Sequence, residues 1–240
     1  MAMRKSSEQL PLAFTHAAAT GRDDLLVSAP LEAAATIVDR WPDWPSPVVV
    51  LVGPPGSGKS HLAAIWQETS GAVTIEAHTD DGASLTAASA PVLLEDADAH
   101  AFDERELFHV INSVRQHGTA LLLTARTPPS AWGVALPDLA SRLKAATIVE
   151  IGAPDEALLS QVIVKLFADR QLAVDDRIVA YLVARMERSL DTARRVVDGM
   201  DRLALSRGVR LTRSLAREVL DAVQGSDGDE AGAADAPELD

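Results

Sequence analysis

The chain has 240 residues, of which 47% are apolar and 24% are charged, so it can bury a core and is not disordered throughout. Thirty-five acidic residues against 22 basic ones give a formal charge of −13, which disfavours direct wrapping of a nucleic-acid backbone. Cysteine is absent, which excludes disulfides, thiolate metal sites and a cysteine nucleophile. Since the longest apolar stretches reach only about five residues, against roughly 18 for a bilayer span, and no signal sequence is visible, we expect a cytoplasmic protein.

The first part of the chain has the pattern of an α/β domain. Residues 41–47 contain three prolines and must form an extended or turning connection. Near-continuous apolar strands then alternate with helix-compatible segments, which is typical of a parallel sheet covered by helices on both faces. The predicted strands are residues 48–52, 73–76, 92–95, 120–124 and 147–151.

After Pro154 the pattern changes to helices only, which predicts a small all-helical domain. Helices are expected over residues 155–169, 175–187, 189–207 and 212–223, with capping residues at their starts and a glycine stop. These residues are Asp155, Asp175, Ser189, Thr212 and Gly208. We therefore divide the chain into an N-terminal flexible segment (1–20), a base domain (21–152), a helical lid (153–223) and an acidic tail (224–240).

The last segment holds six acidic residues and no basic one. Because it also has almost no apolar side chains, it cannot offset its ordering entropy, and we expect it to be disordered and solubilising. An acidic interaction tail is the functional alternative.

A phosphate-binding loop is predicted directly after the first strand. Residues 53–60 match G-x-x-x-x-G-K-[ST] between a strand and a helix, the context that this motif requires. Backbone N–H groups of such a loop surround phosphate oxygens, the lysine reaches the β and γ phosphates, and the hydroxyl holds Mg²⁺. The predicted nucleotide-binding residues here are Gly53, Pro54, Pro55, Gly56, Ser57, Gly58, Lys59, Ser60 and the adjoining His61.

The third predicted strand ends in acidic residues, where a P-loop protein places carboxylates near Mg²⁺ and the attacking water. Glu95 and Asp96 are the candidates, Glu95 as a metal ligand with Ser60 and Asp96 as a catalytic residue. A solvated acidic turn is the structural alternative. An isolated metal site from Asp96, Asp98, His100 and Asp103 would match no specific ligand spacing.

Together these motifs resemble the AAA+ ATPases: a P-loop strand, an acidic strand end, a fourth strand ending in Thr124-Ala125-Arg126, a Ser141-Arg142 element and a helical lid. Residues 121–132 and 136–143 are similar to the replication initiator DnaA and especially to its shorter Hda-like relatives. The resemblance covers about residues 9 to 223. The chain ends where DnaA continues into its DNA-binding domain and lacks the long N-terminal oligomerisation domain, so the Hda-like arrangement is expected.

The resemblance implies a set of site residues. It makes Arg142 an arginine that reaches the nucleotide of a neighbouring subunit, where a guanidinium suits developing phosphate charge. It places Leu25 and Val27 at the adenine pocket. Two departures stand out: Glu95 replaces the usual aspartate, and Asp191 replaces the usual lid arginine, for which Arg194 one turn later is the candidate substitute. The implied cofactors are ADP or ATP with Mg²⁺.

Residues 9–14 resemble the hexapeptide with which Hda-like proteins bind the replication sliding clamp. An extended segment can place apolar side chains in a pocket and orient itself with the glutamine amide, and the residues concerned are Gln9, Leu10, Leu12 and Phe14. The alternative is an apolar strap that folds back onto the core.

The expected function is therefore Hda-like negative regulation of replication initiation, in which the protein stimulates ATP hydrolysis by DnaA through Arg142 in trans. The expected partners are DnaA and the sliding clamp (the β subunit of DNA polymerase III), with a homodimer left open and DNA reached mainly through the clamp. The main alternative is an autonomous AAA+ ATPase that works as a homo-oligomer, like a helicase loader. A small phosphotransferase and a DNA-binding initiator rank lower.

Overall fold

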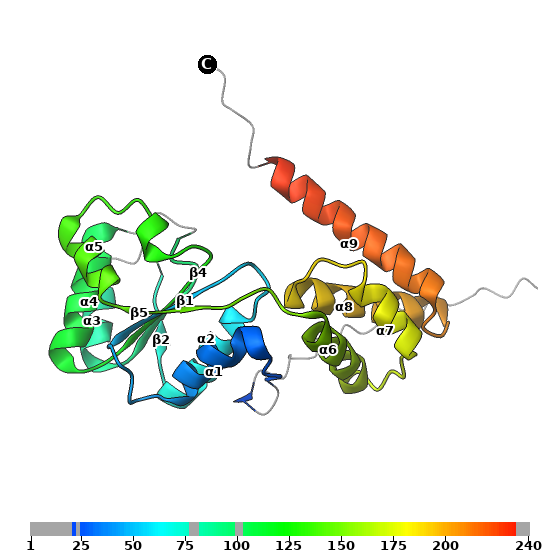
Figure 1. Cartoon of the computed structure of the whole chain (residues 1–240), viewed down its shortest axis with the longest axis horizontal. Coiled ribbons are helices and arrows are strands. Elements are labelled where there is room, and N and C mark those ends of the chain that lie inside the picture. The colour runs from blue at the N-terminus through cyan, green and yellow to red at the C-terminus, as the bar shows by residue number, and fades with distance from the viewer. Residues whose placement is uncertain (1–20, 23–24, 77–81, 99–102, 234–240) are drawn as a thin grey trace, which may run out of the picture.

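The computed structural model describes residues 21–22, 25–76, 82–98 and 103–233. It contains a base built on a five-stranded sheet and a separate helical lid, and in Figure 1 the two lie side by side. The predicted fold class is confirmed. Within the described residues, no helix is both long and apolar enough to cross a membrane.

All strand pairs of the sheet are parallel, and the strand order is β2-β3-β4-β1-β5. The central strands consist wholly of buried residues, which explains why their sequences are continuously apolar. The strands are β1 (Val48–Val52), β2 (Val73–Thr74), β3 (Val92–Leu94), β4 (Leu121–Ala125) and β5 (Thr147–Glu150). Only β2 is clearly shorter than its predicted range.

Alternate side chains of β1 enter two different cores, one on each face of the sheet. The face that carries Val49 and Leu51 packs against α1 (Ala29–Asp39) and α2 (Lys59–Ser70). The opposite face packs against α3 (Gly82–Ser89), α4 (Glu104–His117) and α5 (Pro137–Lys144), with the short η2 helix (Pro129–Ala131) beside α5. Figure 1 shows these two helical layers on either side of the strands.

The lid consists of α6 (Glu156–Asp169), α7 (Asp176–Val183), α8 (Leu190–Arg207) and α9 (Arg213–Ala233) around its own apolar core. The predicted caps are confirmed: Asp155, Asp175, Ser189 and Thr212 each accept a backbone N–H of the following first turn. Gly208 ends α8 in the left-handed conformation, as predicted.

The helix end predicted at Val223 is wrong, because α9 continues to Ala233 and enters the segment expected to be disordered. A helix that is already nucleated gains one hydrogen bond for each residue it adds, and no proline interrupts the chain before Pro237. α7 shows the opposite error, since it ends at Val183 rather than at residue 187.

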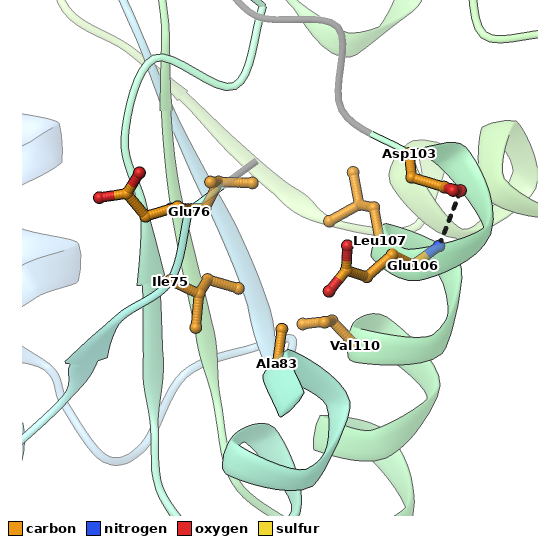
Figure 2. A pocket seen from close by; sticks show the side chains of 8 residues that line it. Ile75, Glu76, Ala83, Asp103, Glu106, Leu107 and Val110 are labelled. Atoms are coloured by element: carbon orange, nitrogen blue, oxygen red, sulfur yellow. Dashed lines mark hydrogen bonds between the residues drawn. The ribbon is translucent and has the colours of Figure 1, made fainter. Parts of the chain in front are cut away.

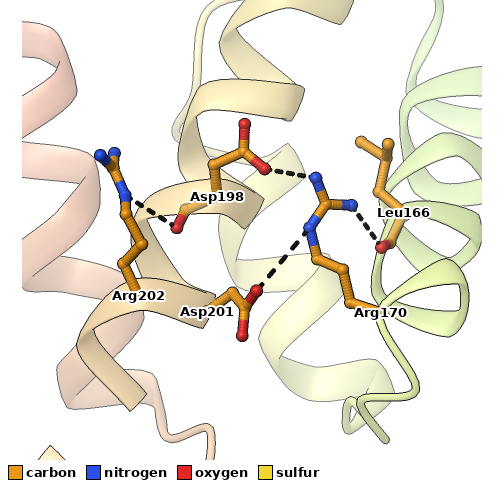
Figure 3. Close-up of polar contacts among 5 residues, drawn as sticks. All are labelled: Leu166, Arg170, Asp198, Asp201 and Arg202. Carbon is orange, nitrogen blue, oxygen red and sulfur yellow. Dashed lines mark hydrogen bonds and ion pairs between the residues drawn. The ribbon is translucent and has the colours of Figure 1, made fainter. Parts of the chain in front are cut away.

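A polar cluster fastens α6 to α8 inside the lid. The Arg170 guanidinium donates to the Leu166 carbonyl at 2.7 Å, pairs with the Asp198 carboxylate, and lies 4.0 Å from a carboxylate oxygen of Asp201. Arg202 donates to the Asp198 carbonyl at 3.3 Å, as Figure 3 shows. Since the Arg170 side chain is only 14% exposed, these contacts satisfy a charge that would otherwise be costly to bury.

Candidate functional site

The loop between β1 and α2 has a backbone that only glycine adopts easily. Gly56 and Gly58 have φ values of 65° and 101°, in the left-handed region. At Gly56 a Cβ atom would also lie 2.0 Å from the Ser189 hydroxyl oxygen of the lid. The loop therefore keeps its N–H groups close to the surface, as a phosphate cradle requires.

Lys59 lies folded over this loop. Its side chain is only 7% exposed, and its ammonium donates to the carbonyls of Gly53 at 2.7 Å and Pro54 at 2.9 Å. Burial lowers the pKa of Lys59, and the carboxylate of Asp96 counteracts this effect. An incoming phosphate would offer the ammonium a charged acceptor in place of neutral carbonyls.

The acidic end of β3 lies near the Lys59 ammonium, as expected from the order of the strands. The backbone N–H of Asp96, a residue with a φ of 48°, donates to the Thr124 hydroxyl of β4 at 2.9 Å. One carboxylate oxygen of Glu95 is buried and has no hydrogen-bond partner among the described residues. A buried carboxylate oxygen without a donor is suited to a cation, so Glu95 and the exposed hydroxyl of Ser60 fit the predicted Mg²⁺ ligands.

Asp98 has a structural role that the sequence did not suggest. Its carboxylate accepts the backbone N–H groups of Arg126 at 2.9 Å and Thr127 at 2.7 Å, and the Thr127 hydroxyl at 2.8 Å. Burial raises the pKa of Asp98, but these hydrogen bonds outweigh it and the net pKa is lowered. Asp98 thereby fixes the chain just after β4 and positions Arg126, whose charge acts on Lys59.

The alternative metal site gains no support. Asp98 is occupied by the backbone after β4, and Asp103 caps α4 by accepting the N–H groups of Arg105 and Glu106. His100 lies outside the described residues. No group of three or more potential ligands that could hold a metal occurs in the described part of the chain.

A small hollow beside this region does not offer a second ligand site. It measures about 10 Å³ and lies between α3, α4 and the residues after β2, as Figure 2 shows. A volume of that size holds about one water molecule. It is lined by Ile75, Glu76, Ala83, Leu94, Asp103, Glu106, Leu107 and Val110.

The lid contacts the P-loop directly. The N–H of Leu190, the first residue of α8, donates to the Gly56 carbonyl at 2.8 Å. One turn further on, the Arg194 guanidinium lies 3.5 Å from the His61 ring nitrogen Nδ1 in the first turn of α2. Arg194 thus faces the start of α2 beside the P-loop, whereas Asp191 is exposed at the start of α8. The predicted residues His61 and Arg194 are brought together from positions far apart in the sequence.

The helix that follows the predicted adenine segment borders the same loop. Leu25 packs against the core under α1 and α2, while the Val27 side chain is 44% exposed. The Leu31 side chain, which follows in α1, would lie 3.5 Å from a Cβ at Gly58, as would that of Leu190. Apolar side chains of the base and the lid therefore meet beside the phosphate loop.

Arg142 is not part of this cluster. It lies near the end of α5, which leads from the carboxyl end of β4 to the amino end of β5, whereas the P-loop follows the carboxyl end of β1. Figure 1 shows α5 on the side of the base away from the lid. The Arg142 side chain is partly exposed and makes no ion pair within the described residues.

The predicted clamp-binding residues Gln9, Leu10, Leu12 and Phe14 lie outside the described residues. Sequence reasoning also missed Asp98, Thr124 and Arg126 as organising residues of the site. Their only signal was position, since Thr124 and Arg126 lie at the end of β4, which neighbours β1, and Asp98 follows β3, which neighbours β4.

No family model matches the chain. An uncharacterised protein of Haemophilus influenzae is 30% identical to it over 121 residues, which is 49% of this chain and 52% of that protein. The chain thus spans about half the length of this curated relative.

Several solved structures have a similar fold. Domain III of the Thermotoga maritima replication initiation protein DnaA matches with a TM-score of 0.73 at 14% identity, over 85% of this chain and 96% of that one. AMPPCP-bound DnaA from Aquifex aeolicus matches with a TM-score of 0.64 at 18% identity, over 86% of this chain and 69% of that one. The Thermotoga maritima RuvB Holliday junction branch migration motor matches with a TM-score of 0.62 at 16% identity, over 80% of this chain and 66% of that one. The chain therefore has the AAA+ fold of DnaA and RuvB.

Proposed function

We propose that this protein binds adenine nucleotide, ADP or ATP, at the P-loop with Mg²⁺. Three features support the proposal: the left-handed glycine loop, the Lys59 ammonium held on neutral carbonyls, and the buried Glu95 oxygen without a donor. A similar fold binds AMPPCP in DnaA from Aquifex aeolicus.

In this proposal the loop N–H groups and Lys59 hold the phosphates, and Leu25 and Val27 contact the base. Ser60 and Glu95 would hold Mg²⁺, which neutralises phosphate charge when it is bound. Asp96 orients water, and Arg194 faces the phosphates from the lid.

We further propose that the protein is an Hda-like regulator that stimulates ATP hydrolysis by DnaA. The observation that carries this step is the position of Arg142, which lies on α5 away from the protein's own P-loop and has no ion pair among the described residues. A guanidinium in that position serves a nucleotide on another subunit, and such a residue in trans contributes about 10³ to 10⁵ in rate. Conversion of DnaA to its ADP form would suppress repeated initiation.

In the same proposal Gln9, Leu10, Leu12 and Phe14 bind the sliding clamp, through which the protein reaches DNA. Replacing Gln9 and Phe14 by alanine should abolish clamp-dependent stimulation while nucleotide binding stays intact. Full stimulation by that double variant would refute the clamp step.

The deciding experiment measures phosphate release from ATP-loaded DnaA with clamp on DNA, after addition of the wild-type protein or Arg142→Ala. We expect the substitution to remove the stimulation. Lys144→Ala is the matched control, because it removes an exposed positive charge from the last turn of the same helix and should keep the activity. Equal loss in both variants would indicate a general charge effect instead.

The second candidate function is an autonomous ATPase that acts as a homo-oligomer. The same position of Arg142 allows it, because the acceptor subunit would then be another copy of this chain. Turnover by the purified protein without DnaA, dependent on Lys59 and Arg142, would favour it over DnaA regulation.

A further inference from the structure

The lid differs in charge from the rest of the chain. Residues 153–223 hold 12 lysines and arginines against 11 acidic residues, whereas residues 1–152 hold 10 against 18 and residues 224–240 hold none against six. The net negative charge of the protein therefore lies outside the lid, and a conclusion from the total charge does not apply to it.

Most lid arginines that pair with carboxylates do so within the lid itself. Ion pairs join Arg170 to Asp198, Arg188 to Glu156, Arg207 to Glu218 and Arg217 to Asp221. Five exposed lid arginines make no ion pair with any described residue, and these are Arg177, Arg185, Arg202, Arg210 and Arg213. Arg177 belongs to α7 and Arg185 follows its end, while Arg213 is the first residue of α9 and Arg210 lies three residues before it.

Two of these unpaired arginines meet on one aromatic ring. The guanidinium carbon of Arg185 lies 4.4 Å from the centroid of the Tyr181 ring, and that of Arg213 lies 4.6 Å from it. The two charges are therefore no more than about 9 Å apart, within roughly one Debye length at physiological salt. Arg177 lies one helical turn before Tyr181, so it shares the same face of α7.

This arrangement leaves the arginine donors available. Cation–π contact uses the flat face of a guanidinium, while its N–H groups lie in the plane and point outward. Neither the Arg185 nor the Arg213 side chain donates a hydrogen bond to a described residue. The Tyr181 ring thus holds two cations close together with their donor edges free, and an anion between them would relieve their mutual repulsion.

We propose that Arg185 and Arg213 on the Tyr181 ring, with Arg177 on the same face of α7, form a surface that binds the phosphodiester backbone of nucleic acid. We call this surface the Tyr181 face. Arginine, rather than lysine, supplies all of its charges, and the guanidinium fork matches phosphate oxygens in a bidentate way. The proposal stands apart from the nucleotide site, since α7 lies at the end of the lid farther from the sheet, as Figure 1 shows.

The test measures binding of the full chain to a labelled 20-nucleotide oligo-dT and to a 20-base-pair duplex by fluorescence anisotropy, between about 25 and 200 mM salt. For the double variant Arg185→Ala/Arg213→Ala, we expect affinity to fall on the order of 100-fold near 50 mM salt. The log–log salt slope should flatten by about 1.5 to 2, because two phosphate contacts are lost. Whichever of the two probes binds more tightly shows whether the Tyr181 face prefers single-stranded or duplex nucleic acid.

The matched control is Arg188→Ala/Arg207→Ala, which removes the same charge from exposed lid arginines that already pair with Glu156 and Glu218. It should change the affinity by less than about threefold. Arg185→Lys/Arg213→Lys should keep the salt slope and lose part of the affinity, because charge remains but the fork does not. Circular dichroism confirms that each variant is folded.

Three outcomes would overturn the proposal. The wild-type chain could fail to bind either nucleic acid at 25 mM salt, or both alanine double variants could lose the same affinity. The third is competition by polyglutamate as effective, per charge, as that by unlabelled oligo-dT, which would assign the Tyr181 face to an acidic protein segment.

Discussion

The base and the lid are stabilised in different ways. The base buries whole strands between two helical layers, and its functional groups belong largely to the backbone and to short loops at the ends of strands. The lid buries one face of each helix and carries an arginine-rich surface, much of it paired with its own carboxylates. The two meet at the P-loop, where Leu190 donates to Gly56. The sheet thus holds the P-loop in place, while an independently packed helical unit contacts that loop.

The largest effect on stability should come from a cavity-creating substitution in the lid core. Phe167 is fully buried there, and Phe167→Ala should cost about 3 to 5 kcal/mol of lid stability through lost burial and a cavity. All four tryptophans precede residue 153, so tryptophan fluorescence reports the base while circular dichroism at 222 nm reports the helices of both parts. We expect the circular dichroism transition to shift in urea and the fluorescence transition to stay.

A cavity variant in the core of the base is the counterpart of the Phe167→Ala variant in the lid. Leu122→Ala, in the centre of β4, should shift the fluorescence transition by a similar amount. Coincident shifts of both signals in both variants would show that base and lid unfold as one unit.

Nucleotide affinity should depend most on Lys59. Lys59→Ala removes charge-assisted hydrogen bonds worth about 1.5 to 3 kcal/mol, so affinity for ADP should fall about 10- to 100-fold in calorimetry. Lys144→Ala, on an exposed site of the base, is the control and should leave affinity unchanged.

The pH dependence of binding follows from the same lysine. Its pKa in the free protein is lowered by burial, and phosphate binds the protonated form, so affinity should decrease as the pH rises through that lowered pKa. Since the ordinary pKa of lysine is about 10.4, the decrease in affinity should begin below pH 10.4. In Lys59→Arg the decrease should disappear, because arginine stays charged. A wild-type affinity that is constant up to pH 10 would contradict the inferred loss of the Lys59 proton below that pH.

The contact between base and lid can be broken at a single glycine. Gly56→Ala places a Cβ atom 2.0 Å from the Ser189 hydroxyl oxygen at a φ of 65°, so α8 must move away from the loop. We expect about a tenfold loss of nucleotide affinity, because Arg194 moves with α8. Gly71→Ala is the matched control: its φ is 69°, but nothing lies within 4 Å of the new Cβ. It should reduce stability by about 1 kcal/mol without changing affinity. Equal affinities of the two variants would mean that the lid contact does not contribute to the site.

Local patterns were sufficient to predict much of the fold, and long-range contacts were not. Residues 48–52 could be recognised as a buried parallel strand because every side chain is apolar, and Ser189 as a cap because its hydroxyl acts within one turn. The P-loop was predicted because the spacing of its glycines and lysine along the sequence determines the conformation of the loop. In contrast, Arg194 and His61 are 133 residues apart, and Asp98 binds backbone groups 28 and 29 residues away. Such partners depend on strand order and lid orientation, which no local spacing encodes.

The smallest predicted effect separates the acid sensitivity of the two regions. Asp98→Asn replaces a carboxylate that accepts three hydrogen bonds, and it should cost the base about 1 kcal/mol at neutral pH. Because the folded pKa of Asp98 is lowered, its contribution is present above the unfolded pKa of about 3.9 and is lost as the pH falls through the folded value. The fluorescence transition of the variant should therefore depend less on pH below about 5 than that of the wild type. The control is Asp175→Asn, which keeps an equally good helix cap in the lid and should leave both signals unchanged. If Asp98→Asn retained the full acid dependence of the wild type, the chain after β4 would be held by its backbone contacts alone rather than by the carboxylate charge.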